Sequence, residues 1–309
     1  MGVMAQLLGA AIGEGTPLLL AALGCLLSER VGIINLGAEG MMLMGAVSTA
    51  LVSAQGGDVW VALVCGAAAG GVLGVLHALT TVTLLANQIV SGLAITLFGT
   101  GLSAYLGKPI AGNPVPGAIP VLNLPLLDKI PWIGPVFAHL DVVVWFSVIL
   151  AVALFLYIER TSWGLNLRAV GDSPATADVM GIHVLRHRYA YVVLGGMLVG
   201  LSGAYLLFST SPSWVEGMTA GRGWIAVALV IFARWNPVRA VFGAYLFGGL
   251  DALGFRIQLM GTETPSYFLK MLPYVLTVVV LMILGLRSRR RYSGMPLSLG
   301  SAYVREERS

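Results

Sequence analysis

The stretch of sequence that decides the fold is Asp172-Ser173-Pro174-Ala175-Thr176-Ala177-Asp178-Val179-Met180-Gly181, inside a polar insert, Glu159 to Arg188, that separates two apolar segments. A Ser or Asp able to cap a helix, a Pro suited to the first turn and a Gly that ends it predict a short helix over 174–180. A membrane protein has little reason to hold so short a capped helix at its surface unless a soluble partner docks there. The insert therefore predicts a membrane subunit driven by a cytoplasmic partner.

The composition predicts an all-α integral membrane protein. Charged residues are only 10% of the chain, against roughly 25% in ordinary soluble domains. Apolar residues make up 57%. One membrane bundle accommodates this length, so we expect a single transmembrane domain over 1–286, followed by a basic tail over 287–309 that needs no structure.

The basic residues predict the orientation in the membrane. They concentrate in the insert 159–188 and in the arginine-rich residues 287–291. This is the distribution of orientation charges and not of a nucleic-acid surface, and the positive-inside rule places both stretches in the cytoplasm. Residues 1–15 contain no Lys or Arg, so the basic region of a cleaved signal peptide is missing. We expect a retained N-terminus outside and a cytoplasmic C-terminus.

Several chemistries are not expected of this chain. Cys25 and Cys65 lie in apolar runs, which is typical of buried small hydrophobic residues and not of disulfide or metal ligands. The four histidines are scattered, so we expect no metal site. The sequence contains neither a Gly-Lys-Ser/Thr phosphate loop nor a nucleophile elbow. We therefore expect no enzyme activity, no bound cofactor and no ATP hydrolysis by the chain itself.

The apolar segments predict about nine transmembrane helices, within a range of eight to ten. They lie at about 3–28, 40–54, 60–83, 89–107, 142–158, 189–209, 222–233, 240–256 and 271–286. A membrane core of about 30 Å needs about 20 helical residues, so 40–54 and 222–233 reach only part of the way. Short segments of this kind, interrupted by Gly and Pro in two corresponding halves, indicate discontinuous helices around a site in mid-membrane.

The two halves show an internal correspondence. Glu39-Gly40-Met41 and Ala50-Leu51-Val52 recur as Glu216-Gly217-Met218 and Ala228-Leu229-Val230, at an offset of 177 or 178. Counting crossings from the cytoplasmic insert places Glu39 on the inner side of its helix and Glu216 on the outer side. The pattern therefore predicts an inverted repeat.

The segment 108–141 holds seven of the fourteen prolines. Proline fixes φ and removes amide donors, so we expect a stiff extracytoplasmic loop and not a helix. Such a loop either forms an ordered cap over the bundle or, with Trp132 and Phe137, rests on the membrane or receives a partner. The sequence leaves both alternatives open.

Three runs resemble ABC-transporter permeases of the simple-sugar and nucleoside uptake type. They are Glu29-Arg30-Val31-Gly32-Ile33-Ile34-Asn35-Leu36-Gly37-Ala38-Glu39-Gly40-Met41, Gly164-Leu165-Asn166-Leu167-Arg168-Ala169-Val170-Gly171-Asp172-Ser173-Pro174, and Gly221-Arg222-Gly223-Trp224-Ile225-Ala226-Val227-Ala228-Leu229-Val230-Ile231-Phe232-Ala233-Arg234-Trp235-Asn236-Pro237. The third run looks most like the shorter permease of nucleoside importers. Branched-chain amino-acid permeases are more distant relatives that share the Gly-Ile-Ile-Asn type of turn.

The resemblance implies a subunit of a bacterial inner-membrane importer. Its expected partners are a second permease of different sequence, a cytoplasmic ATPase that carries ATP and Mg²⁺, and an extracytoplasmic solute-binding lipoprotein, all within membrane lipid and without nucleic acid. The insert becomes the coupling element that the ATPase moves as a lever. Its expected coupling residues are Arg168, Asp172, Ser173, Pro174, Ala175, Thr176, Ala177, Asp178 and Gly181. The alternative is a loop whose arginines only set topology.

A second set of polar residues is expected to border the translocation path. It comprises Asn35, Glu39, Asn87, Gln88, Ser91, Arg222 and Trp224. A carboxylate in mid-membrane needs water, a cation or a helix end, so Glu39 is either part of the path or a cap of the following helix. Asn35 is either a solute ligand or a turn residue. Asn87, Gln88 and Ser91 are alternatively an interhelical clamp, and Trp224 an interfacial anchor.

Other functions remain open at the level of the sequence. A simple sugar such as ribose is an alternative cargo to a purine or pyrimidine nucleoside. A secondary transporter would use Glu39 and Asp251 to carry its coupling ion, but it leaves the capped helix at 174–180 without a purpose. A membrane scaffold or channel subunit is the third alternative, and dependence of solute flux on ATP separates all three.

Overall fold

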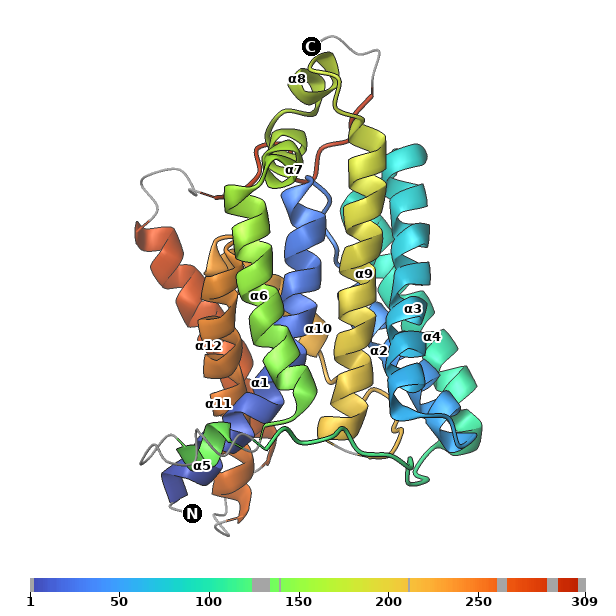
Figure 1. The fold of residues 1–309 in the computed structure, drawn as a ribbon, viewed down its shortest axis with the longest axis vertical. Helices are drawn as coiled ribbons and strands as arrows, with labels where there is room; N and C mark the ends of the chain where they lie inside the picture. Colours follow the sequence, from blue (N-terminus) through green and yellow to red (C-terminus); the bar gives the residue numbers. More distant parts are fainter. Residues whose placement is uncertain are drawn as a thin grey trace.

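The computed structural model describes residues 3–123, 134–138, 140–210, 212–259, 266–287 and 294–304. Within these residues the regular elements are helices, which confirms the predicted all-α class (Figure 1). The α-helices are α1 Val3–Arg30, α2 Ala38–Ala54, α3 Val59–Ala78, α4 Gln88–Gly107, α5 Gly134–Phe137, α6 Val142–Arg160, α7 Ser162–Asp172, α8 Pro174–Val179, α9 Val184–Ser209, α10 Arg222–Ala233, α11 Pro237–Leu259 and α12 Ser266–Arg287. A π-helical turn, η1 Leu79–Thr83, extends α3, and a 3-10 turn, η2 Lys108–Ile110, extends α4.

Each of the nine predicted apolar segments overlaps a helix of the described part. Eight of them overlap the six long and two short apolar helices, and the ninth, 271–286, overlaps α12. Six helices of the described part are long and apolar enough to cross a membrane, whereas α2 and α10 are shorter apolar helices. Because α10 has 12 residues, it rises only about 18 Å, little more than half of a membrane core. The protein is therefore a multi-pass membrane protein that contains two helices of partial depth.

The helix α1 forms the centre of the bundle. In its membrane-crossing window 78% of the residues are buried, compared with 28% in α6 and 33% in α4. Helices α4 and α6 thus present apolar side chains such as Leu97 and Ile149 at the periphery, where a membrane protein meets lipid. This arrangement agrees with the integral membrane protein that the composition predicts.

The short helix α10 lies beside one half of α1. Its first residue, Arg222, pairs with Glu14 near the middle of α1. Just past its last turn, the Trp235 carbonyl accepts a hydrogen bond from Arg30 at the end of α1. The helix therefore runs from the middle of the bundle to one end of it.

The short helix α2 occupies the other half of the bundle. Immediately before it, the Leu36 carbonyl accepts a hydrogen bond from Thr96 in the middle of α4. Near its end, Thr49 donates to the Ala62 carbonyl in the first turns of α3. The helices α2 and α10 thus begin close together in the middle of the bundle and run toward opposite ends.

The two halves share one helix order but run in opposite directions. In each half a long helix (α1 or α9) precedes a short one (α2 or α10) and a further long one (α3 or α11), and Figure 1 shows α1 and α9 running in opposite directions. The residue-level match at an offset of 177 does not hold, because Glu39 is buried in the first turn of α2 whereas Glu216 is exposed in a turn before α10. The correspondence lies between elements and not between the two glutamates.

The proline-rich segment forms an ordered cap in the part that the structure describes. Main-chain hydrogen bonds join Val115 to Pro212 and Gly112 to Trp214, and Leu122 bonds to Leu140. Residues 124–133, including Trp132, lie outside the described residues. Where it is described, the loop therefore packs on the segment that follows α9, as the first of the two alternatives expected.

Residues 294–304 differ from the expectation that the tail needs no structure. They pack on the end of the bundle that carries α7 and α8, where Ser298 donates to the Gly171 carbonyl through both its amide and its hydroxyl. The Gly300 amide donates to Gly32, and the Ser301 carbonyl accepts from Gln88. We call residues 294–304 the C-terminal strap, because it ties the polar insert to the turn that follows α1.

Removing the C-terminal strap should destabilise the protein. A chain ending at residue 293 loses three hydrogen bonds to Gly171 and Gly32, each worth about 0.5–1.5 kcal/mol. We expect a loss of about 2–4 kcal/mol in the free energy of unfolding, measured by thermal unfolding in detergent. A chain ending at residue 304 keeps every contact described for the strap and should unfold like the full chain. Equal behaviour of the two truncations would show that the strap does not stabilise the fold.

Candidate functional site

The centre of the molecule is a junction between the beginnings of α2 and α10, and Glu39 holds it together. One carboxylate oxygen accepts hydrogen bonds from the Thr219 hydroxyl at 2.6 Å and the Gly221 amide at 2.8 Å. The other accepts from the Gly223 amide at 2.7 Å. Glu39 therefore caps α10, a helix that begins about 180 residues further along the chain.

Glycine at position 223 allows this close approach. A Cβ atom there would collide with the backbone of Glu39. The positive end of the α10 dipole and its free amides thus surround a carboxylate that is 8% exposed. One alternative from the sequence was that Glu39 caps the helix that it begins, α2. The structure shows a helix cap, but the helix that the Glu39 carboxylate caps is α10.

The irregular segment 31–37 reaches the junction from the end of α1, and side chains of α3 and α4 satisfy its backbone. His77 bonds to the Ile34 carbonyl at 2.9 Å, and Gln88 accepts from the Ile34 amide at 2.8 Å. Asn35 is fully buried, and its side-chain oxygen accepts from the Gly37 amide at 3.1 Å. Irregular backbone inside a membrane requires such partners, because lipid supplies none.

The polar residues at the start of α4 form the clamp that was the alternative to a solute path. Ser91 bonds to His77 at 3.0 Å and to Thr80 at 2.6 Å. Asn87 caps α4 by accepting from the amides of Ile89 and Val90. In this conformation Asn35, Asn87, Gln88 and Ser91 all hold backbone or neighbouring side chains, and their place on the translocation path remains a prediction.

Sequence reasoning missed His77. His77 lies in an apolar run without a neighbouring metal-ligand pattern, so no residue near it in the sequence indicates its hydrogen bond to the Ile34 carbonyl. The run Leu79-Thr80-Thr81-Val82-Thr83 was the available hint, since it forms a π-helical turn directly after His77 and such turns are frequent at functional sites.

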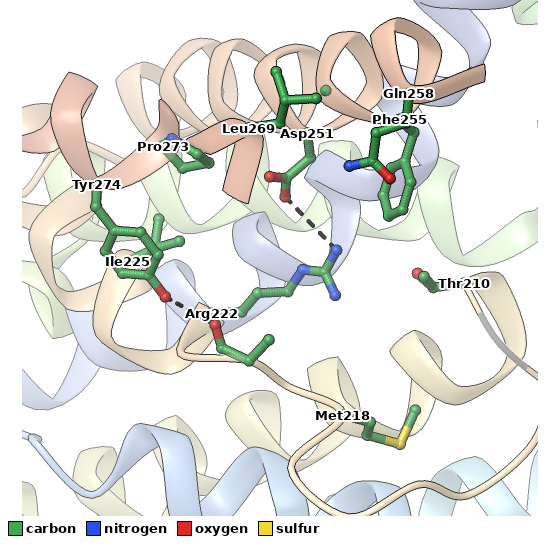
Figure 2. A pocket seen from close by; sticks show the side chains of 12 residues that line it. Thr210, Met218, Arg222, Ile225, Asp251, Phe255, Gln258, Leu269, Pro273 and Tyr274 are labelled. Atoms are coloured by element: carbon green, nitrogen blue, oxygen red, sulfur yellow. Dashed lines mark hydrogen bonds and ion pairs between the residues drawn. The ribbon is translucent and has the colours of Figure 1, made fainter. Parts of the chain in front are cut away.

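A cavity of about 310 Å³ opens next to the junction, between the start of α10, α11 and α12 (Figure 2). Arg222 extends into it and is 9% exposed. Its guanidinium lies 2.5 Å from a Glu14 carboxylate oxygen and 3.6 Å from one of Asp251. Asp251, which a secondary transporter would use to carry its coupling ion, lies instead in an ion pair with Arg222.

Of the two residues expected on the path at the start of α10, only Arg222 lines this cavity. Trp224 is half-buried and does not line it. The Tyr274 hydroxyl on α12 donates to the Ala220 carbonyl at 2.8 Å, which closes the opposite side of the cavity. The cavity thus combines one cation, Arg222, and one carboxylate, Asp251, with several apolar walls.

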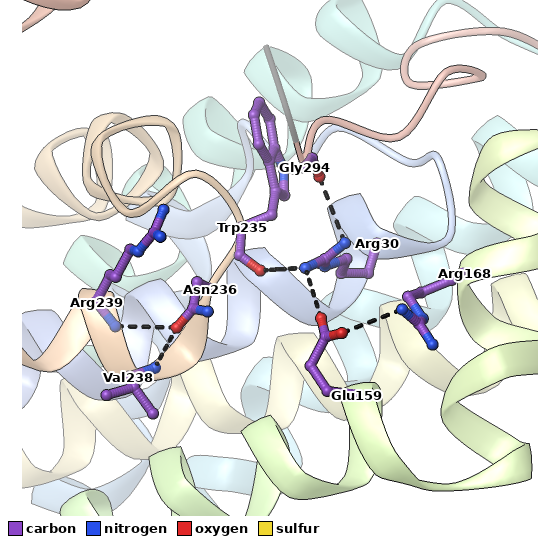
Figure 3. A network of polar contacts seen from close by, with 8 residues as sticks. All are labelled: Arg30, Glu159, Arg168, Trp235, Asn236, Val238, Arg239 and Gly294. Carbon is purple, nitrogen blue, oxygen red and sulfur yellow. Dashed lines mark hydrogen bonds and ion pairs between the residues drawn. The ribbon is translucent and has the colours of Figure 1, made fainter.

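A second polar network ties the polar insert to the ends of α1 and α10 (Figure 3). Arg168 on α7 donates to Glu159 at 3.1 Å, and the other oxygen of Glu159 lies 3.7 Å from the Arg30 guanidinium. Arg30 in turn donates twice to the Trp235 carbonyl, and the Trp235 indole donates to Glu29 at 2.6 Å. A chain of contacts therefore runs from α7 to the end of α10, whose other end lies at the junction.

The predicted helix at 174–180 is present as α8. Pro174 begins it, and Gly181, with φ of +83°, follows its end as the left-handed residue that a helix stop requires. The Ser173 hydroxyl bonds to the Thr176 hydroxyl at 2.7 Å. A second helix, α7, precedes it and was not predicted, although Thr161 gave a capping signal and accepts from the Gly164 amide at 3.0 Å.

The two faces of α8 differ. Ala177 is 2% exposed and packs on the bundle, whereas Val179 and Met180 are 86% and 76% exposed. Ala175 and Thr176 are also exposed. Arg168 and Asp172 bond inward, to Glu159 and to the Leu297 amide of the strap. The outer surface of the insert therefore includes α8 with its apolar tip, together with Trp163 and Leu165 of α7, which are 64% and 58% exposed.

Metal binding receives no support from the described residues, among which there is no group of three or more His, Cys, Asp or Glu that could hold an ion.

The main features of the described structure are a multi-pass helical bundle, two partial helices that meet in its middle, and a polar arm at one end that consists of α7 and α8. These features are typical of membrane transport proteins built around interrupted helices.

Comparison with known proteins identifies the family. Residues 7–283 match the model described as branched-chain amino acid transport system / permease component, and the chain belongs to this family of ABC transporter permeases. It is 37% identical, over 99% of both chains, to the putative glucose ABC transporter permease protein TsgC13 of Haloferax volcanii. It is 35% identical to the nucleoside ABC transporter permease protein NupC of Lactococcus lactis, over 86% of this chain and 88% of that protein.

A solved structure shares the fold. It is described as an inward-facing conformation of a putative metal-chelate type ABC transporter, and it matches 90% of this chain and 85% of its own with a TM-score of 0.54 and 17% identity. The protein is therefore an ABC transporter permease subunit of the sugar and nucleoside uptake type, a transport component and not an enzyme.

Proposed function

We propose that this chain is the permease subunit of an ATP-driven importer of nucleosides. The observation that carries the proposal is the 35% identity to a nucleoside permease over most of both chains, together with the run 221–237, which forms α10 and its flanks at the central junction. The 37% identity to a putative glucose permease supports a simple sugar as the second candidate. Both candidates are small polyhydroxylated solutes.

The proposed assembly contains a second permease of different sequence, a cytoplasmic ATPase that binds ATP and Mg²⁺, and an extracytoplasmic binding protein, in a bacterial inner membrane. The arm of α7 and α8 would face the cytoplasm, with the C-terminal strap beside it and the N-terminus outside. The arginines of the insert, among them Arg160 and Arg186, support this orientation by the positive-inside rule.

Coupling would follow the contacts between the arm and the junction. The ATPase would grip α8 and move α7, and Arg168, Glu159 and Arg30 would pass that movement to the end of α10. Because α10 is a short rod capped by Glu39, a shift at one end displaces the other. The cavity at Arg222 would then change its access, with Asn35, Gln88, Ser91 and Trp224 bordering the path as the neighbouring helices part.

Substrate competition tests the proposal. The chain would be reconstituted with its second permease, its ATPase and its binding protein in proteoliposomes, and ATP-dependent uptake of labelled uridine would be measured. We expect adenosine and uridine to compete and glucose and ribose not to. ATP-dependent uptake of labelled glucose, with no uptake of labelled uridine, would establish the sugar candidate. Uptake that persists without ATP and collapses with an ionophore would establish an ion-coupled transporter.

A further inference from the structure

The cavity beside Arg222 carries a feature that its protein contacts do not explain. Arg222 is 9% exposed, and its guanidinium reaches Glu14 and Asp251 through Nη2. Its buried Nε has no hydrogen-bond partner within the described residues. A buried donor left unpaired is costly, so the protein alone does not fully satisfy the guanidinium of Arg222, the cation that lines this cavity.

The charges at this wall restrict the ligand. Arg222 and Asp251 line the cavity, and Glu14 pairs with Arg222 from outside that lining. Carboxylates already neutralise the guanidinium, which disfavours an anion as the ligand. A carboxylate only accepts hydrogen bonds and a guanidinium only donates them, whereas a hydroxyl does both. A pair of neighbouring hydroxyls therefore fits between Asp251 and Arg222, one donating to the carboxylate and one accepting from the guanidinium.

The other walls of the cavity are suited to a planar apolar group. Phe255 on α11 is 50% exposed, and Leu269 and Met218 also line the space. Gln258, one turn from Phe255, offers both a carbonyl and an amide toward the same cavity. An aromatic ring can stack on a planar base, and an amide can pair with the edge of that base. A volume of about 310 Å³ is at the small end of ligand pockets.

We propose that this cavity is a nucleoside subsite within the permease itself, with the ribose hydroxyls between Arg222 and Asp251, the base stacked on Phe255 and the base edge paired with Gln258. The inference rests on the proposed function. It adds that the membrane subunit recognises the base, so that selectivity does not reside in the binding protein alone. A simple sugar would occupy only the polar end of the cavity.

The central test is Phe255→Ala in a transporter of the two permeases and the ATPase, assembled in lipid nanodiscs without the binding protein. Tritiated uridine binding to this assembly would be measured by equilibrium dialysis. Loss of stacking on one base weakens binding roughly five- to a hundredfold, and we expect a decrease in this range. Phe255→Trp keeps an aromatic face and should retain binding. The matched control is Phe242→Ala on the same helix, which removes a ring that is 72% exposed and does not line the cavity.

A second variant keeps the proposal testable if Phe255→Ala fails to fold. Gln258→Leu preserves the size of an exposed side chain and should weaken uridine binding while leaving the amount of assembled transporter unchanged. Binding by Phe255→Ala and Gln258→Leu equal to that of Phe242→Ala would overturn the subsite while nucleoside uptake by the wild type continued. Absence of nucleoside uptake by the wild-type transporter with its binding protein would instead refute the proposed function.

Discussion

Glu39→Ala is expected to cause a large loss of stability. The carboxylate accepts from Thr219, Gly221 and Gly223, and all three donors lie in or next to the buried start of α10. No water is at hand in mid-membrane to replace the lost acceptor. Each buried donor left unpaired costs about 1–3 kcal/mol, so the variant should lose roughly 3 kcal/mol or more.

Thermal unfolding in detergent measures this loss, and Asp58→Ala supplies the comparison. Asp58 also caps a helix through its carboxylate, accepting from the Trp60 amide at 2.8 Å, but it is exposed. Water replaces its acceptor, so that variant should lose only about 1 kcal/mol. If the two variants unfolded alike, the buried junction would not be the structural centre that its contacts indicate.

Much of the fold was predictable because a membrane imposes strong local rules. Long apolar runs identify crossings, and the runs 40–54 and 222–233 were too short to cross. Their structures as α2 and α10 follow from that shortness. The helix α8 was predictable for a different reason, since Ser173, Pro174 and Gly181 are local start and stop signals.

The partners of the polar residues were not predictable. Glu39 carried the right signal for a helix cap, but the helix it caps is set by how the two halves meet. Gln88 and His77 bond to the main chain of Ile34, and a main-chain partner leaves no mark in the side-chain pattern. The strap escaped prediction because serines and glycines, which are typical of mobile tails, supply its hydrogen bonds to Gly171 and Gly32.

The structure also divides the predicted coupling residues into two groups. Arg168 and Asp172 bond inward, and Ala177 packs on the bundle, so these residues would transmit movement or hold the arm. A bulky or charged residue in place of Ala177 would disturb packing before it reached a partner. Ala175, Val179 and Met180 are exposed instead, and we propose that they form the surface that binds the ATPase.

Replacing both Val179 and Met180 by Ser should separate the permease from its ATPase. Both side chains are more than three-quarters exposed, and adjacent apolar side chains at the tip of a polar arm are typical of an interaction surface. Burying a Val or Met side chain contributes about 1.5–3 kcal/mol. Loss of both should therefore weaken ATPase binding on the order of a hundredfold, since each 1.4 kcal/mol is about a factor of ten.

Two assays measure the effect. The fraction of ATPase that co-purifies with the permease is followed over a series of dilutions in detergent at constant salt, and ATP-driven uptake is measured in parallel. We expect normal amounts of permease in the membrane, because neither side chain supports the bundle. Val121→Ser/Leu122→Ser is the matched control, since it removes two adjacent apolar side chains that are 51% and 40% exposed in the proline-rich cap on the other end of the molecule. Its ATPase binding should equal that of the wild type. Undiminished binding in the Val179/Met180 double variant would mean that the ATPase does not bind at the end of α8. The proposed transmission of movement from α8 to the junction would then be contradicted.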